Sequence, residues 1–123
     1  MPSDQQKTCQ RFAALYMPPE INEKVGIALG TLDRLPLHAV RLQPNNGDCG
    51  WYIHGGENSD DANFCQPLHV SHVAGYCAKI IPYLALPPGW RVFLAPDYED
   101  VWLDDKLIKN ISGGKWRPVT DIR

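Results

Sequence analysis

Histidine and cysteine side chains gather in one stretch of the sequence, and both residue types can bind metals. His69 and His72 are three residues apart, with Cys65 before them and Cys77 after them. Residues three apart share one face of a helix, so two imidazoles and a cysteine there would hold a transition metal. However, the spacing matches no standard zinc motif, and Cys77 falls on the apolar side of the expected helix. We therefore predict no metal and no other cofactor. A small metal-binding or enzymatic domain using His69, His72 and Cys65 is the alternative.

Nucleophilic catalysis has a weaker signal in the same stretch. Cys65 and His69 would form a thiolate–imidazole pair if a helix began at Pro67, but no flanking pattern typical of a protease surrounds them. Helical spacing also places five polar and aromatic side chains on one face, as in a solvated or binding surface: His69, His72, Tyr76, Lys79 and Tyr83. We therefore predict that the protein is not an enzyme and has no catalytic residues.

Acidic side chains are concentrated further along the chain. Residues 97–105 contain five acids and no base, whereas residues 106–123 contain five bases and one acid. Carboxylates can pair with the Arg and Lys side chains of a basic active site, while aromatic side chains supply contact area. A hairpin loop kept soluble by its acids, with Trp102 in the core, is the simpler interpretation. The sequence predicts a partner-binding site formed by Asp97, Tyr98, Glu99 and Asp100, with Glu57, Asp60 and Asp61 as further acids.

The composition excludes several classes of protein. A chain of 123 residues predicts one domain spanning 1–123. The net charge of −2 argues against a general nucleic-acid binder. No apolar run approaches the ~20 residues that cross a membrane, and the N-terminus lacks the pattern of a signal peptide. We therefore expect a cytoplasmic protein that binds neither nucleic acid nor membrane. In that compartment we expect free, buried thiols at the four cysteines, Cys9, Cys49, Cys65 and Cys77.

The chain divides into short elements separated by Pro and Gly. The first half predicts a helix over 4–16, a segment over 24–32 that suits either helix or strand, and a hairpin of strands 37–42 and 49–54. The second half predicts its longest helix over 67–84, kinked or ended by Pro82. Strands over 91–95 and 101–104 follow, joined by a loop over 96–100, and residues 115–123 suit either a strand or a tail. The fold class is therefore α+β, a small antiparallel sheet of hairpins packed against one or two helices.

Specific strings add to this pattern. Cys49-Gly50-Trp51-Tyr52-Ile53 precedes Gly56-Glu57, and Phe64 precedes Pro67-Leu68-His69-Val70. Tyr83 to Arg91 reads YLALPPGWR, and Tyr98 to Asp104 reads YEDVWLD. Over about residues 48–104 the chain resembles the Imm33 family of bacterial polymorphic-toxin immunity proteins, formerly a domain of unknown function; residues 1–45 and the last 18 residues carry no such string. The motif positions are Trp51, Gly56, Glu57, His69, Pro87, Pro88, Gly89, Trp90 and Trp102.

The resemblance implies a role and not a reaction. Such proteins are encoded beside toxins used in interbacterial competition, and each is expected to bind its cognate toxin domain and neutralise it by direct occlusion. It also implies an α+β fold, and no catalytic residues can be transferred to this chain. The shared positions Trp51, Trp90 and Trp102 are then as well explained by the fold as by contact with a partner.

Overall fold

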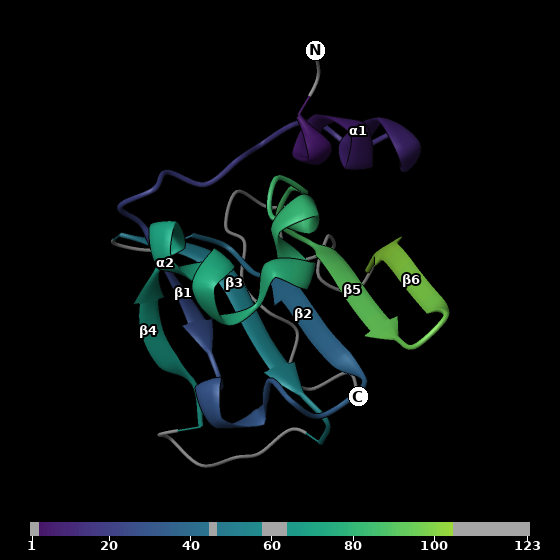
Figure 1. The fold of residues 1–123 in the computed structure, drawn as a ribbon. Helices are drawn as coiled ribbons and strands as arrows, with labels where there is room; N and C mark the ends of the chain where they lie inside the picture. The colour runs from purple at the N-terminus through teal and green to yellow at the C-terminus, as the bar shows by residue number, and fades with distance from the viewer. Residues whose placement is uncertain (1–2, 45–46, 58–63, 105–123) are drawn as a thin grey trace.

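A six-stranded sheet forms the centre of this computed structural model, which describes residues 3–44, 47–57 and 64–104 (Figure 1). The strand order is β4-β1-β3-β2-β5-β6, and every neighbouring pair is antiparallel except the parallel pair β1–β3. The strands are β1 Lys24–Ile27, β2 Leu37–Arg41, β3 Asp48–Gly55, β4 Gln66–His69, β5 Trp90–Ala95 and β6 Tyr98–Leu103. The helices are α1 Asp4–Arg11, α2 Val70–Tyr76 and two short 3₁₀ helices, η1 Leu29–Thr31 and η2 Ala78–Tyr83. This arrangement confirms the predicted α+β fold, with its hairpin of β2 and β3.

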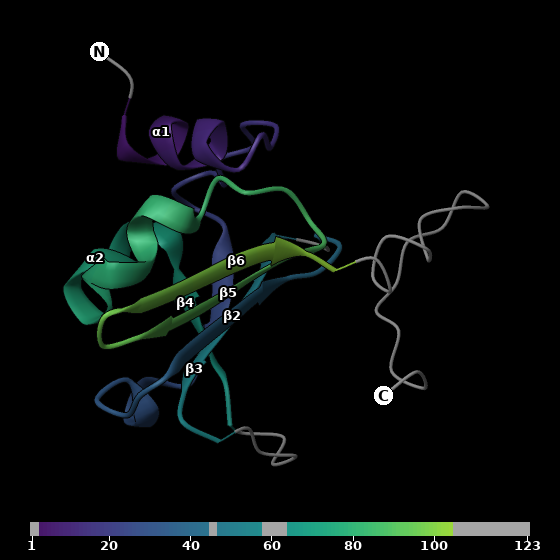
Figure 2. The same cartoon turned by 90° about the vertical axis from the view of Figure 1, so that its right-hand side faces the viewer.

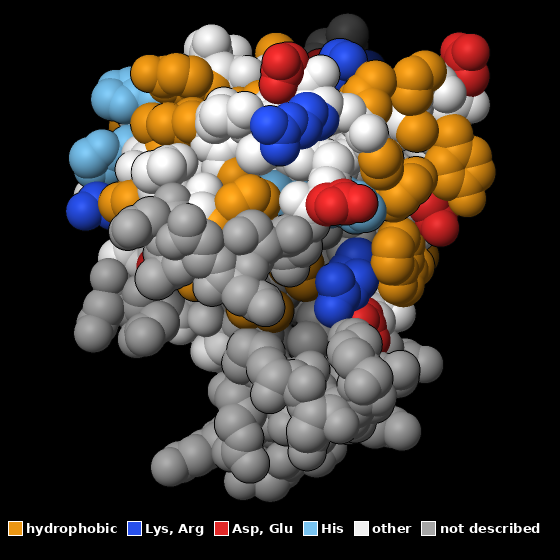
Figure 3. Space-filling model, turned by 90° about the horizontal axis from the view of Figure 1, so that it is seen from below, with side chains coloured by type: hydrophobic (Ala, Val, Ile, Leu, Met, Phe, Trp, Pro, Cys, Tyr) orange, Lys and Arg blue, Asp and Glu red, His pale blue; other side chains and the backbone are white. Residues whose placement is uncertain are grey.

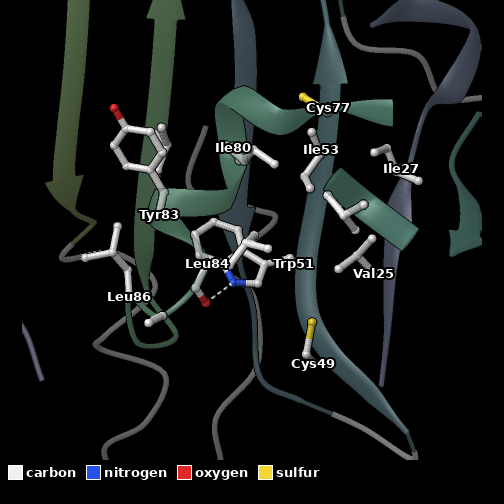
Figure 4. Packing of buried hydrophobic residues seen from close by; sticks show 14 of the residues in the cluster. Val25, Ile27, Cys49, Trp51, Ile53, Cys77, Ile80, Tyr83, Leu84 and Leu86 are labelled. Atoms are coloured by element: carbon white, nitrogen blue, oxygen red, sulfur yellow. Dashed lines mark hydrogen bonds between the residues drawn. The ribbon is translucent and has the colours of Figure 1, made fainter. Parts of the chain in front are cut away.

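The helices α2 and η2 cover one face of the sheet (Figure 2). Alternate residues of the central strands point to that face, such as Val25, Ile27, Trp51 and Ile53, and all four are fully buried. Trp51 lies in the middle of this core, where its indole Nε1 donates a hydrogen bond of 2.8 Å to the carbonyl oxygen of Leu84 (Figure 4). The opposite face, which we call the open face, carries the other set of alternating side chains.

A buried arginine connects three segments of the chain through its hydrogen bonds. Arg41 of β2 is only 4% exposed, and its guanidinium donates to the carbonyl oxygens of Cys49 at 2.9 Å, Met17 at 2.6 Å and Leu86 at 2.8 Å. Burial lowers the pKa of this guanidinium, but an arginine stays charged throughout the accessible pH range. The carbonyl dipoles therefore stabilise the buried charge, and Arg41 fixes the chain after α1 and the turn after η2 against the sheet.

Two helix predictions need correction. The helix predicted over 4–16 begins with a capping box of Ser3 and Gln6 but ends at Arg11, because Ala13 takes a left-handed conformation with φ of 56°. The long helix predicted over 67–84 is wrong.

Three separate elements occupy 67–84. β4 pairs with β1, so that Pro67 lies opposite Gly26. α2 follows, and it ends where Cys77 adopts an extended φ of −150°. The 3₁₀ helix η2 then contains Pro82. Strand pairing with β1 is a long-range contact, and it overrides the local helical periodicity.

The loop predicted over 96–100 is shorter than expected. Only Pro96 and Asp97 form the turn between β5 and β6, and Asp97 adopts a positive φ of 61°. Residues 24–32, which suited either helix or strand, form β1 followed by η1. The predicted final element at 115–123 lies outside the described residues.

All four cysteines are free thiols, as predicted. Cys9, Cys49 and Cys77 are buried and Cys65 is partly buried. No helix within the described ranges is long and apolar enough to span a membrane.

Candidate partner-binding surface

The predicted acidic site lies on the hairpin of β5 and β6, and the strand pairing divides its residues between two faces. Val92 of β5 is buried beneath the helices, and its partner in β6 is Val101. Directly paired residues share a face, so Glu99 also points toward the helices. Tyr98, Asp100 and Trp102 therefore point to the open face. The four acidic-site residues do not form one cluster.

The carboxylate of Glu99 is held by contacts with other elements of the protein. It forms an ion pair with Arg11 of α1 at 2.6 Å and accepts a hydrogen bond from the hydroxyl of Tyr83. The hydrogen bonds from Arg11 and Tyr83 lower the pKa of Glu99. Burial and the bond to Glu99 raise the pKa of Tyr83 to about 12. Glu99 therefore connects α1, η2 and β6, and its charge is already neutralised.

Asp97 and Asp100 are different, because neither forms an ion pair with any residue in the described ranges. Both side chains are exposed, and Tyr98 between them is 56% exposed. Seen from below, hydrophobic side chains gather on the side of the molecule where β5 and β6 lie, with acidic side chains among them (Figure 3). Asp97, Tyr98 and Asp100 are thus the members of the predicted site that a partner can reach.

Five rings form a continuous line across the open face, which we call the aromatic row. Tyr98 of β6 contacts Phe93 of β5, with ring centroids 5.8 Å apart. Phe93 and His38 of β2 form a T-shaped pair with ring centroids 5.1 Å apart, and His38 stacks on His54 of β3 at 4.8 Å. His54 in turn contacts Phe64, which precedes β4, at 5.6 Å. A row of this kind offers rigid contact area at a low cost in side-chain entropy.

A second line of side chains runs beside the aromatic row. The register places Trp102, Arg91, Val40, Tyr52 and Gly26 next to one another on successive strands. Trp102 is 39% exposed and Tyr52 is 36% exposed. The ring of Tyr52 lies over Gly26, where an added Cβ would come within 2.7 Å of the ring. Arg91 does not add a free positive charge, because it forms an ion pair with Asp104 at 2.6 Å.

The two histidines of the aromatic row are held in their neutral form. Burial lowers the pKa of both imidazoles; Arg91 lowers that of His38 further, and His38 lowers that of His54. The Nδ1 atom of His54 is buried and has no hydrogen-bond partner within the described ranges. An open hollow of about 430 Å³ adjoins this pair, and Glu57 contributes to its wall. Glu57 therefore lies at the margin of the open face, whereas Asp60 and Asp61 lie outside the described residues.

The proposed metal ligands are not brought together. Cys65 immediately precedes β4 and His69 is its last residue, and four residues of a strand span about 13 Å. His69 and His72 are neighbours at the start of α2, with ring centroids 5.9 Å apart. Within the described part of the chain, no group of three His, Cys, Asp or Glu side chains is arranged to hold a metal ion.

The motif positions have mostly structural roles. Trp51 is in the core, and Trp90 is half-buried against Phe12, with centroids 6.5 Å apart. Pro87, Pro88 and Gly89 form the turn into β5, in which Gly89 has a φ of 99° that favours glycine. Gly56 follows β3, also with a positive φ. Trp102 is the exposed tryptophan of the three, and therefore the one available for contact.

Sequence reasoning missed most of the open face. His38 and His54 each lie between two buried neighbours on their strands, and Phe93 follows the buried Val92, and that alternation was a usable signal. It does not show which residues lie opposite one another, and the aromatic row exists only through the register of four strands.

The fold and surface define a small α+β domain with an exposed aromatic face. A family model of the Imm33-like domain matches residues 4–104, well beyond the 48–104 that the strings cover. The chain therefore belongs to the Imm33-like family. Searches of curated proteins and of solved structures each found no match.

Proposed function

We propose that this protein is a cytoplasmic immunity protein that binds a cognate bacterial toxin domain and neutralises it by direct occlusion, without catalysing a reaction. The observation that carries the proposal is membership of the Imm33-like family over residues 4–104. The name of the family points to immunity, and an immunity protein acts on a protein partner.

The open face is the surface that best suits such a partner. At about 4.8 Å per strand and 3.3 Å per residue, a sheet of six short strands presents roughly 500 Å² before the relief of its side chains is counted. A stable interface needs about 800 Å² from each protein, so the open face would supply the larger part of such an interface and the β6 edge would add to it. Tyr98 and Trp102 supply the aromatic anchors, and Asp97 and Asp100 supply charge that no described residue neutralises.

The charge suggests the nature of the toxin surface. Two carboxylates that form no ion pair among the described residues lie beside exposed rings, and such a surface complements a basic patch, such as the active site of an enzyme that acts on nucleic acid. Association would then be accelerated by electrostatic steering, and it would slow as salt is added.

The test is protection of cells that express the toxin domain encoded beside this protein. We expect growth to recover only when the protein is present, and purified toxin activity to fall linearly to zero at a molar ratio near one. Toxin recovered from the complex should regain activity and keep its mass. Failure to protect, with no complex formed, would refute the proposal. Protection at far below one equivalent, or a changed toxin mass, would instead indicate an enzymatic antidote.

A matched pair of variants locates the surface. Asp100→Lys reverses a charge on the open face, whereas Glu20→Lys makes the same change in the exposed loop before β1. We expect slower association and weaker protection for the first variant only. Equal behaviour of the two variants would show that the acids of β6 do not meet the toxin.

A further inference from the structure

Among the described residues, the strand β6 forms an edge of the sheet. It is paired on one side by β5 and is the last strand in the order. Such an edge presents a row of backbone N–H and C=O groups that can pair with another strand. The other edge, β4, is shorter and contains Pro67, which cannot donate a hydrogen bond. The two edges therefore differ in their capacity to accept a new strand.

The hydrogen-bond pattern shows which groups of β6 point outward. The amide of Asp104 donates to the carbonyl oxygen of Gly89 at 2.8 Å, on the β5 side. Backbone groups of an antiparallel strand alternate between its two neighbours. Trp102, Asp100 and Tyr98 therefore bond to β5, as the closing pair of a two-residue turn also requires. The outward N–H and C=O groups belong to Glu99, Val101 and Leu103.

The side chains beside this edge suit a partner with a basic strand. A strand added to β6 would place its side chains on the open face next to Tyr98, Asp100 and Trp102. Asp100 has no ion pair within the described part of the chain, and both rings are exposed. A Lys or Arg beside Asp100 would pair with its carboxylate, and apolar side chains on either side would pack against the rings of Tyr98 and Trp102.

A second copy of this chain fits the edge less well. Glu99 and Asp100 are the charged residues of β6, and Glu99 is already paired with Arg11. Two β6 strands brought together would therefore add a second Asp100 carboxylate and no base. Like charges across a strand pair are destabilising. Charge complementarity thus favours a different, basic chain.

We propose that the toxin domain docks by adding one of its own strands to β6, which extends the sheet to a seventh strand and places a basic toxin side chain beside Asp100. This inference rests on the proposed function and names its mode of contact. The outward backbone groups of Glu99, Val101 and Leu103 would supply the hydrogen bonds, and Tyr98 and Trp102 would fix the register. The aromatic row would then end beside the added strand, at Tyr98.

Amide hydrogen exchange of the native protein tests this directly. In the free protein we expect slow exchange at Tyr98, Asp100 and Trp102, and fast exchange at the outward amides. On formation of the toxin complex, the outward amides should become protected at least about tenfold. A complex that forms without this alternating gain would overturn the strand-addition proposal and leave the immunity function standing. If no complex forms, both proposals fail.

Two variants at one position provide an independent test. Leu103→Ala and Leu103→Pro remove the same side chain, but only the proline removes the outward N–H and adds a ring at the edge. Proline is tolerated on an edge where the N–H faces outward. We expect Leu103→Pro to bind at least about tenfold more weakly than Leu103→Ala, or ~1.4 kcal/mol. Equal affinity of the two folded variants would refute the proposal, as would a free protein that sediments as a dimer with its outward amides already protected.

Discussion

Replacement of Trp51 by phenylalanine tests the account of the core. Trp51 is fully buried, and its indole N–H donates to the Leu84 carbonyl oxygen at 2.8 Å. Loss of that hydrogen bond costs about 1 kcal/mol, and the space left by the smaller ring costs about 1 kcal/mol more. The Leu84 oxygen would still accept a long hydrogen bond of 3.4 Å from Arg41. The additional penalty for leaving a buried acceptor without a partner is therefore small. The free energy of unfolding should therefore fall by about 2–3 kcal/mol.

The matched control is the same substitution at Trp102, which is 39% exposed on the open face. There we expect a change within about 0.5 kcal/mol, since exposed positions tolerate substitution. Urea unfolding followed by far-UV circular dichroism measures both variants, and a thermal scan should show a Tm lower by roughly 8–12 °C for Trp51→Phe. A loss below about 1 kcal/mol at Trp51, or equal losses at the two positions, would refute the assignment of core and face.

Three further predictions concern titration and reactivity. The pKa values of His38 and His54 are lowered in the folded state, so the unfolded chain binds more protons below about pH 6.5. The free energy of unfolding should therefore fall from that pH toward pH 5. His38→Phe keeps an aromatic ring and should flatten this slope, as measured by urea titrations at several pH values. Glu99→Gln should lower the free energy of unfolding by about 1 kcal/mol at pH 7. Because the pKa of Glu99 is lowered in the folded state, this difference should begin to shrink as the pH falls past the ordinary pKa of a glutamate, and it should vanish below the lowered pKa of the folded state. Asp100→Asn is the control and should leave stability unchanged. Of the four thiols, Cys65 should react first with a thiol reagent, because it is the one that is not buried. Mass spectrometry of the modified native protein measures the order of reaction, and faster modification of any buried thiol would contradict the packing.

The parts of the fold that follow from local sequence were predictable. The alternation in 37–42 and 49–54, with a turn between them, identified the β2–β3 hairpin. The helix predicted over 67–84 from its spacing is wrong, because β4 forms by pairing with β1, about forty residues earlier in the sequence. No local pattern reports such a contact, and a helical phase fits short apolar runs as well as a strand does.

In the candidate site, too, the features that depend on local sequence were predicted and those that depend on long-range contacts were not. Its acids were found from composition, but the role of Glu99 was not, because the ion pair with Arg11 joins residues 88 apart in the sequence. The residues that sequence alone placed in one loop lie on two faces of β6, since a strand sends successive side chains to opposite sides. The exposed pair, Asp97 and Asp100, is the part of the prediction that a partner-binding proposal can use.

Gly26 sets the position of one of the exposed rings on the open face. The ring of Tyr52 lies over this residue because it has no side chain, and a methyl group would meet the ring at 2.7 Å. Any larger residue at position 26 must turn Tyr52 away from β1, and with it one of the exposed rings beside the aromatic row. Under the proposed function, a substitution at position 26 would therefore reshape the contact surface through the ring of Tyr52 as well as through the new side chain itself. Comparison of paired toxin and immunity sequences should accordingly look for covariation at position 26 as well as at the exposed rings.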